Sequence, residues 1–149
     1  MLPSPMSFQW LKMRISEEQD RRLREAQIRD RLPRAFDDLH HALAECIESY
    51  TAAFGAEAAE LTLDGDRISI VVREEADGRW RQRATVEIVM VKTVPGFQIN
   101  SDSGPLVVEV GMLPGDKVFY RDREHDQYIG MDEVTHRALD RAFFPKLRE

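Results

Sequence analysis

Residues 32–54 carry an apolar stripe with the period of an α-helix, and this stripe constrains the fold more than any other feature. Apolar side chains recur every three or four residues, which at about 100° per residue places them on one side of a helix. They are Leu32, Phe36, Leu39, Leu43, Cys46 or Ile47, Tyr50 and Phe54. Such a stripe needs an apolar surface to pack against. Gly55 follows the stripe, and glycine is typical of the position that ends a helix.

After Gly55 the apolar period changes from 3.6 to 2, which predicts strands. Asp64-Gly65 between two alternating runs is a strong hairpin signal. We predict a two-residue turn at Asp64-Gly65 that pairs Leu63 with Asp66 and Leu61 with Ile68. This register places both apolar sets on one face of the sheet.

Further turn signals divide the rest of the chain into short strands. A three-residue loop at Ala76-Asp77-Gly78 would keep the next apolar run on the same face as the previous one. Later turns are expected at Pro95-Gly96, at 101–105, at Pro114-Gly115-Asp116 and at 122–126. Asp132 can cap a final helix, which Pro145 ends.

This order of elements predicts an α+β two-layer sandwich. N-terminal helices precede an antiparallel β-meander of about five to six strands, and a C-terminal helix closes the sheet. We divide the chain into an arm with a charged helix at 1–31 and a single α+β domain at 32–149.

The arm is expected to begin irregularly over residues 1–15. A capping box at Ser16 to Gln19 then predicts the start of a charged helix. Pro33 either separates this helix from the next one or kinks a single helix.

Composition restricts the classes of function. A formal net charge of −6 argues against nucleic acid as a partner, because phosphate binding needs clustered Lys and Arg. The single cysteine, Cys46, excludes an intramolecular disulfide and fits a reducing compartment, so we expect a cytoplasmic protein. No apolar stretch is long enough for a membrane span, and we recognise no signal peptide.

The sheet face opposite the helices carries more apolar residues than a solvated face should. They alternate with charged residues that include Arg83, Glu87 and Glu109. We expect this face to be an interface, covered by the N-terminal segment, by the C-terminal helix or by another chain. The predicted interface residues are Phe8, Trp10, Val71, Val89, Val91, Val107 and Phe119.

The polar side of the first core helix is the candidate metal site. Asp37, Asp38, His41 and Glu45 share this side, with His41 four residues from both Asp37 and Glu45. Carboxylates and imidazoles bind divalent iron, manganese or zinc. A solvated helix surface is the competing interpretation, and it is the one we favour.

No catalytic motif is present. The chain has no Gly-rich phosphate loop and no nucleophile elbow or zinc-protease helix motif. Arg79, Arg81 and Arg83 with Trp80 indicate either an anion-binding strip or a solvated edge hairpin, and neighbouring acidic residues favour the second. His125 is interpreted as part of a charged turn. We therefore assign no catalytic residues and no cofactor.

Two protein groups share parts of this layout. The order of a helix, a β-meander and a second helix, with acidic residues on the first helix, is similar to that of frataxin-like iron-binding proteins. The strand at 84–91 lacks the tryptophan of those proteins. An acidic α+β protein with a spare apolar sheet face also resembles the dimeric chaperones of type III secretion. Those chaperones have a helix in the middle of the sheet, but residues 91–106 show no helical pattern. Likeness of layout does not transfer function.

The sequence thus predicts a non-catalytic protein–protein interaction module, adaptor-like or chaperone-like, that forms a homo-oligomer. One alternative is a weak divalent-metal-binding protein that uses the acidic helix face. Another is a small-ligand carrier or enzyme with a pocket between helix and sheet.

Overall fold

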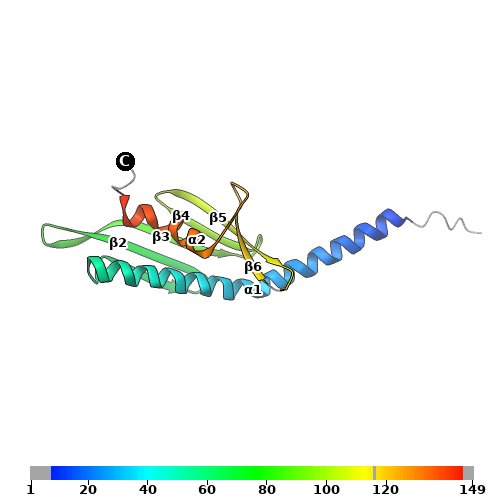
Figure 1. Ribbon diagram of the computed structural model, residues 1–149, viewed down its shortest axis with the longest axis horizontal. Coiled ribbons are helices and arrows are strands. Elements are labelled where there is room, and N and C mark those ends of the chain that lie inside the picture. The colour runs from blue at the N-terminus through cyan, green and yellow to red at the C-terminus, as the bar shows by residue number, and fades with distance from the viewer. Residues whose placement is uncertain (1–7, 116, 146–149) are drawn as a thin grey trace, which may run out of the picture.

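The computed structural model describes residues 8–115 and 117–145, and it contains a seven-stranded antiparallel sheet with helices before and after it (Figure 1). The strands follow one another across the sheet in chain order. The elements are α1 (Gln9–Phe54), β1 (Ala59–Asp64), β2 (Arg67–Ala76), β3 (Arg79–Val91), β4 (Gly96–Ser101), β5 (Gly104–Leu113), β6 (Lys117–Asp122), β7 (Gln127–Ile129) and α2 (Met131–Phe143). The α+β layout is confirmed, with more strands than predicted. The turn predicted at 114–116 joins β5 to β6, and its Asp116 lies outside the described residues.

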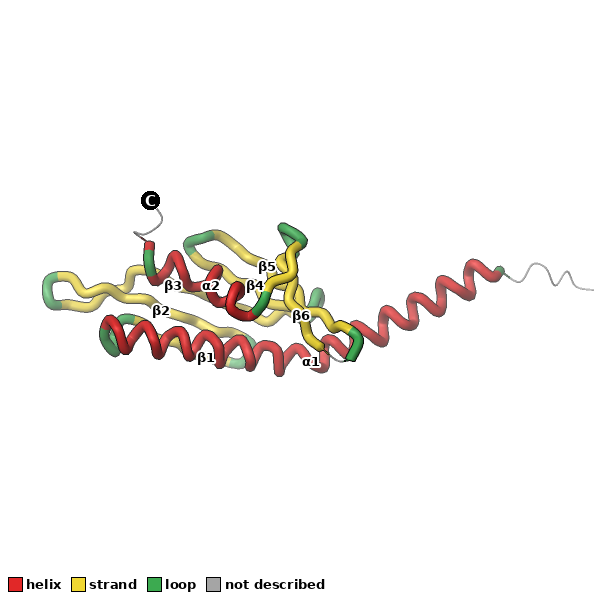
Figure 2. Tube along the Cα trace, viewed as in Figure 1, coloured by secondary structure: helices red, strands yellow, loops and turns green. Residues whose placement is uncertain are grey.

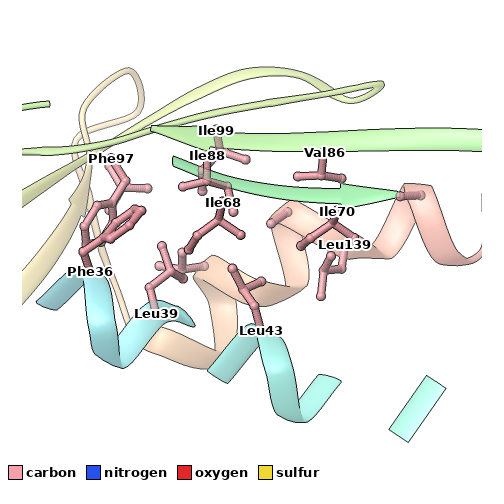
Figure 3. Packing of buried hydrophobic residues seen from close by; sticks show 14 of the residues in the cluster. Phe36, Leu39, Leu43, Ile68, Ile70, Val86, Ile88, Phe97, Ile99 and Leu139 are labelled. Carbon is pink, nitrogen blue, oxygen red and sulfur yellow. The ribbon is translucent and has the colours of Figure 1, made fainter. Parts of the chain in front are cut away.

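The core lies between one face of the sheet and the two helices. Leu39 and Leu43 of α1 are fully buried, as are Ile68 and Ile70 of β2 (Figure 3). The helical stripe and the alternating strands therefore meet as the sequence predicts. α2 contributes the buried side chains Val134, Thr135, Ala138, Leu139, Ala142 and Phe143.

α1 is one helix of 46 residues, and this corrects two predictions. The helix begins at Gln9, so Ser16 lies inside it and caps nothing, and residues 9–15 are not irregular. Of the two alternatives for Pro33, the single bent helix is the one found, and Figure 2 shows the N-terminal part leaving the sheet at an angle. The predicted boundary at 31 and 32 falls within α1, and residues 1–7 of the predicted arm lie outside the described residues.

The end of α1 is as predicted. Gly55 has φ 118°, a backbone conformation that favours glycine, and its N–H donates to the carbonyl of Thr51 at 2.8 Å.

The β1–β2 register differs from the prediction. Leu63 pairs with Ile68 and Leu61 with Ile70, so each partner lies two residues further along β2. The turn residues are Gly65 and Asp66, and only the glycine has positive φ, at 62°. A turn of type II′ needs glycine at this first central position, which explains the shift. Because the shift is even, every side chain keeps its predicted face.

The predicted three-residue loop between β2 and β3 is also wrong. Asp77 and Gly78 alone form the turn, both with positive φ, as a type I′ turn requires. The extra residue lies inside β3 instead. Val72 pairs with Ala84 while the next residue of β2 pairs with Gln82, so Arg83 forms a β-bulge.

Leu43→Ala tests the packing of α1 on the sheet. Leu43 is fully buried in the core, so its truncation should lower the free energy of unfolding by about 2–5 kcal/mol. Chemical denaturation of both proteins measures the difference. Leu63→Ala is the matched control. Leu63 is 45% exposed, so its truncation should lower the free energy of unfolding much less. Equal losses at the two positions would contradict this packing.

Candidate functional site

The outer face of the sheet, opposite the helices, is open among the described residues. Val71, Val89, Val91 and Phe119 are half-buried by their neighbours, and Val107 is 37% exposed. The Phe119 ring lies edge-on to Tyr128, with ring centroids 5.3 Å apart. The five predicted interface residues of the strands therefore share one face.

Several charged residues on the outer face form ion pairs within the chain. Arg67 forms an ion pair with Glu87, and Arg121 forms one with Glu109 at 2.8 Å. The apolar side chains of the face therefore lie among charges that are already paired.

Arg83 does not lie on the outer face, and the prediction that placed it there is wrong. The bulge directs its side chain to the helices, where Nη2 donates to the carbonyls of Ala142 at 2.7 Å and Phe143 at 2.9 Å. Nη2 also lies 3.3 Å from the hydroxyl of Tyr50. Arg83 therefore caps the C-terminal end of α2.

The arm helix, residues 9–31 of α1, extends past the end of the sheet (Figure 1). Trp10 is 65% exposed, and Phe8 is exposed as well, so neither covers the outer face. Close to the sheet, Arg29 donates to the carbonyl of Lys92 at 3.1 Å. The two N-terminal residues of the predicted interface are thus available for contact but do not adjoin the other five.

The candidate metal residues are only partly brought together. Ligand atoms of Asp37, His40 and His41 lie within 4.8 Å of one another, whereas Asp38 and Glu45 are not part of this group. Burial, and after it the charge of Asp38, raises the pKa of Tyr120, which places Asp38 towards β6. The predicted set did not include His40, although its spacing of three from Asp37 is a helical one.

A cavity of about 540 Å³ lies beside α2, at the end of the sheet formed by the later strands. It is lined by Ile99, Ser101, Ser103, Gly104, Pro105, Leu106, Asp122, Glu124, His125, Gln127, Glu133, His136, Arg137, Asp140 and Arg141. Its polar side chains have both signs of charge, so the cavity selects no single class of ligand.

Asp122 is a fully buried carboxylate at the wall of this cavity. It accepts hydrogen bonds from Arg137 Nη1 at 2.5 Å and from the backbone N–H of Glu124 at 3.0 Å. His125 Nδ1 lies 2.9 Å away, and in the tautomer protonated at Nδ1 it donates to Asp122. Burial alone would raise the pKa of Asp122, but the hydrogen bonds from His125 and Arg137 hold it below its usual range.

The cluster around Asp122 fastens the β6–β7 turn to α2. Arg137 also contacts Glu133 and Gln127, so its donors are used within the chain. Sequence reasoning missed this cluster because Asp122 and Arg137 are fifteen residues apart. The three-residue spacing from Asp122 to His125 is the one local signal.

Compared with known proteins, the chain matches no protein-family model, no curated protein and no solved structure. Among its described helices, none is both long and apolar enough to cross a membrane.

Asp122→Asn should destabilise the fold by about 1–3 kcal/mol at pH 7, because it weakens the acceptor of several hydrogen bonds at a buried site. The carboxylate has a lowered pKa in the folded state. Its contribution is therefore present above the unfolded pKa, near 3.8, and is lost as the pH falls through the lower folded value.

Unfolding measured between pH 3 and 7 should show the difference between wild type and Asp122→Asn shrinking below about pH 4. Asp126→Asn is the control. Asp126 lies in the same turn but is exposed, so its loss should change stability by less than about 1 kcal/mol. A pH-independent difference would contradict a role for the charge of Asp122.

Proposed function

We propose that this chain is a non-catalytic protein–protein interaction module, adaptor-like or chaperone-like, that associates with a second copy of itself. The arm helix carries this proposal. It extends away from the domain with large apolar side chains exposed, and it includes Trp10, Leu11, Met13, Ile15 and Leu23.

Three of these side chains form a stripe along the arm helix. At about 100° per residue, Leu11, Ile15 and Leu23 fall within about 120° of one another around the helix. They are 42%, 48% and 61% exposed. Helices in proteins gain most of their stability by packing an apolar side. The stripe is therefore suited to a partner surface.

Ion pairs along the arm helix do not replace such a partner. Arg14 pairs with Glu17 at 3.5 Å and Arg22 with Glu18 at 3.3 Å, both on the exposed surface. Pairs of this kind contribute about 0.2–0.5 kcal/mol each.

The outer face of the sheet is the surface that best complements the arm. Val107 is its exposed apolar side chain, and both surfaces belong to the same chain, so a two-fold contact would bury each arm on the other copy. Charge favours the same arrangement. Residues 9–31 have seven basic and five acidic side chains, whereas residues 32–149 have fourteen basic and twenty-two acidic ones.

The proposed compartment is the cytoplasm. Cys46 is a free thiol, half-buried beside the core, and burial raises its pKa. Such a thiol is unreactive and is compatible with a reducing environment.

Sedimentation velocity of the intact chain tests the proposal, and a dimer is expected. Replacing Leu11 and Ile15 with glutamate should weaken the dimer at least about tenfold, since it places two charges in the apolar contact. The control exchanges Gln9 and Gln27 for glutamate, which adds the same charge about 40° beyond the edge of the stripe.

Val107→Glu on the outer face should weaken the dimer as the arm variant does. A dimer that both the arm variant and Val107→Glu leave intact would contradict the arm-to-sheet contact. An intact chain that stays monomeric at high concentration would contradict self-association itself.

A further inference from the structure

We propose that Asp37, His40 and His41 form a binding site for a divalent transition-metal cation of the zinc type on the exposed side of α1. The proposal does not depend on self-association. It rests on three ligand atoms, two imidazole nitrogens and one carboxylate oxygen, that lie within 4.8 Å of one another.

The spacing of the three residues explains why they converge. Positions i, i+3 and i+4 of a helix are neighbours on its surface. In a tetrahedral zinc site, bonds of about 2.0–2.2 Å place ligand atoms about 3.4 Å apart. Asp37 and His41 are exposed, so small rotations of their side chains are enough to reach this spacing.

The backbone under the site is packed on the core. Phe36 directly precedes Asp37 and Leu39 directly precedes His40, and both are buried in the core. The Phe36 ring contacts Phe97 of β4, with centroids 5.8 Å apart. The ligand side chains therefore leave a turn that the core holds in place, which lowers the conformational cost of binding.

His41 Nδ1 faces the carboxylate of Asp37. It lies 3.7 Å from Oδ2 of Asp37 and 2.9 Å from the backbone carbonyl of the same residue. In the tautomer protonated at Nε2, Nδ1 carries the free lone pair, and binding a cation through Nδ1 replaces the contact with the carbonyl.

The donor set selects the class of metal. Two imidazoles and one carboxylate suit Zn²⁺, Cu²⁺, Ni²⁺ or Fe²⁺, whereas Mg²⁺ and Ca²⁺ prefer oxygen donors alone. Three protein ligands leave at least one coordination position for water or for a second molecule. Asp38 and Glu45 lie on the same helix and add negative charge that attracts a cation.

Isothermal titration of the intact chain with Zn²⁺ tests the site. One saturable ion per chain is expected. Asp37→Asn should weaken binding at least about tenfold, because it removes a ligand, whereas Asp38→Asn should change it less than about threefold. These two variants remove the same charge from adjacent positions, so a difference between them reports coordination.

The histidines provide a second comparison. His40→Ala and His41→Ala should each weaken binding at least about tenfold, while His125→Ala and His136→Ala should leave it unchanged. Circular dichroism verifies that each variant remains folded.

Three results would overturn the proposal. They are the absence of saturable binding, equal effects of Asp37→Asn and Asp38→Asn, and loss of binding in either control histidine variant. The titration is repeated on the Leu11→Glu/Ile15→Glu chain. Unchanged binding there supports a site within one chain, and one ion per two chains in the intact protein would show a shared site and overturn the proposal.

Discussion

Side chains of a β-strand alternate between its two faces, and this alternation must stay in phase across the whole sheet for the helices to find a continuous apolar surface. The Asp77–Gly78 turn alone would set Ile70 opposite Thr85 and Ile68 opposite Glu87, which would point polar side chains of β3 at the helices. The bulge at Arg83 advances β3 by one residue, so that Ile70 pairs with Val86. One inserted residue therefore makes the core between sheet and helices possible.

The inserted residue also joins three elements. Arg83 donates to the last carbonyls of α2, and it lies beside the hydroxyl of Tyr50 on α1. There the rings of Tyr50 and Phe143 stack, with centroids 4.0 Å apart. Elsewhere on α2, Arg137 binds the buried Asp122 of the β6–β7 turn. Charged hydrogen bonds thus hold α2 on the sheet at two places, and apolar packing fills the space between them.

Local patterns predicted the parts of this fold that depend on local physics. The stripe from Leu32 to Tyr50 and the alternation in β2 and β3 follow from burial, and the turn positions follow from glycine. The residues of two turns were wrong because of the local turn type, whereas the larger errors came from effects that extend beyond a short window. Ser16 has the pattern of a helix start, but residues 9–15 contain neither glycine nor proline, and extending a helix costs far less than nucleating one. Arg83 and Asp122 were missed because each binds residues of α2 that are distant in the sequence, and their roles depend on a bulge and a turn.

Pro33 divides α1 into two parts that are stable for different reasons. Proline has no N–H to donate to the carbonyl of Arg29, and in a helix interior this costs about 3 kcal/mol. Beyond it, Ala35, Phe36 and Leu39 are buried on the sheet, so packing offsets the cost. Before it, the arm has exposed ion pairs and the bond from Arg29 to the carbonyl of Lys92. The direction of the arm is therefore set near Pro33 by few interactions, and the proposed contact with a second copy would add the packing that this part of α1 lacks.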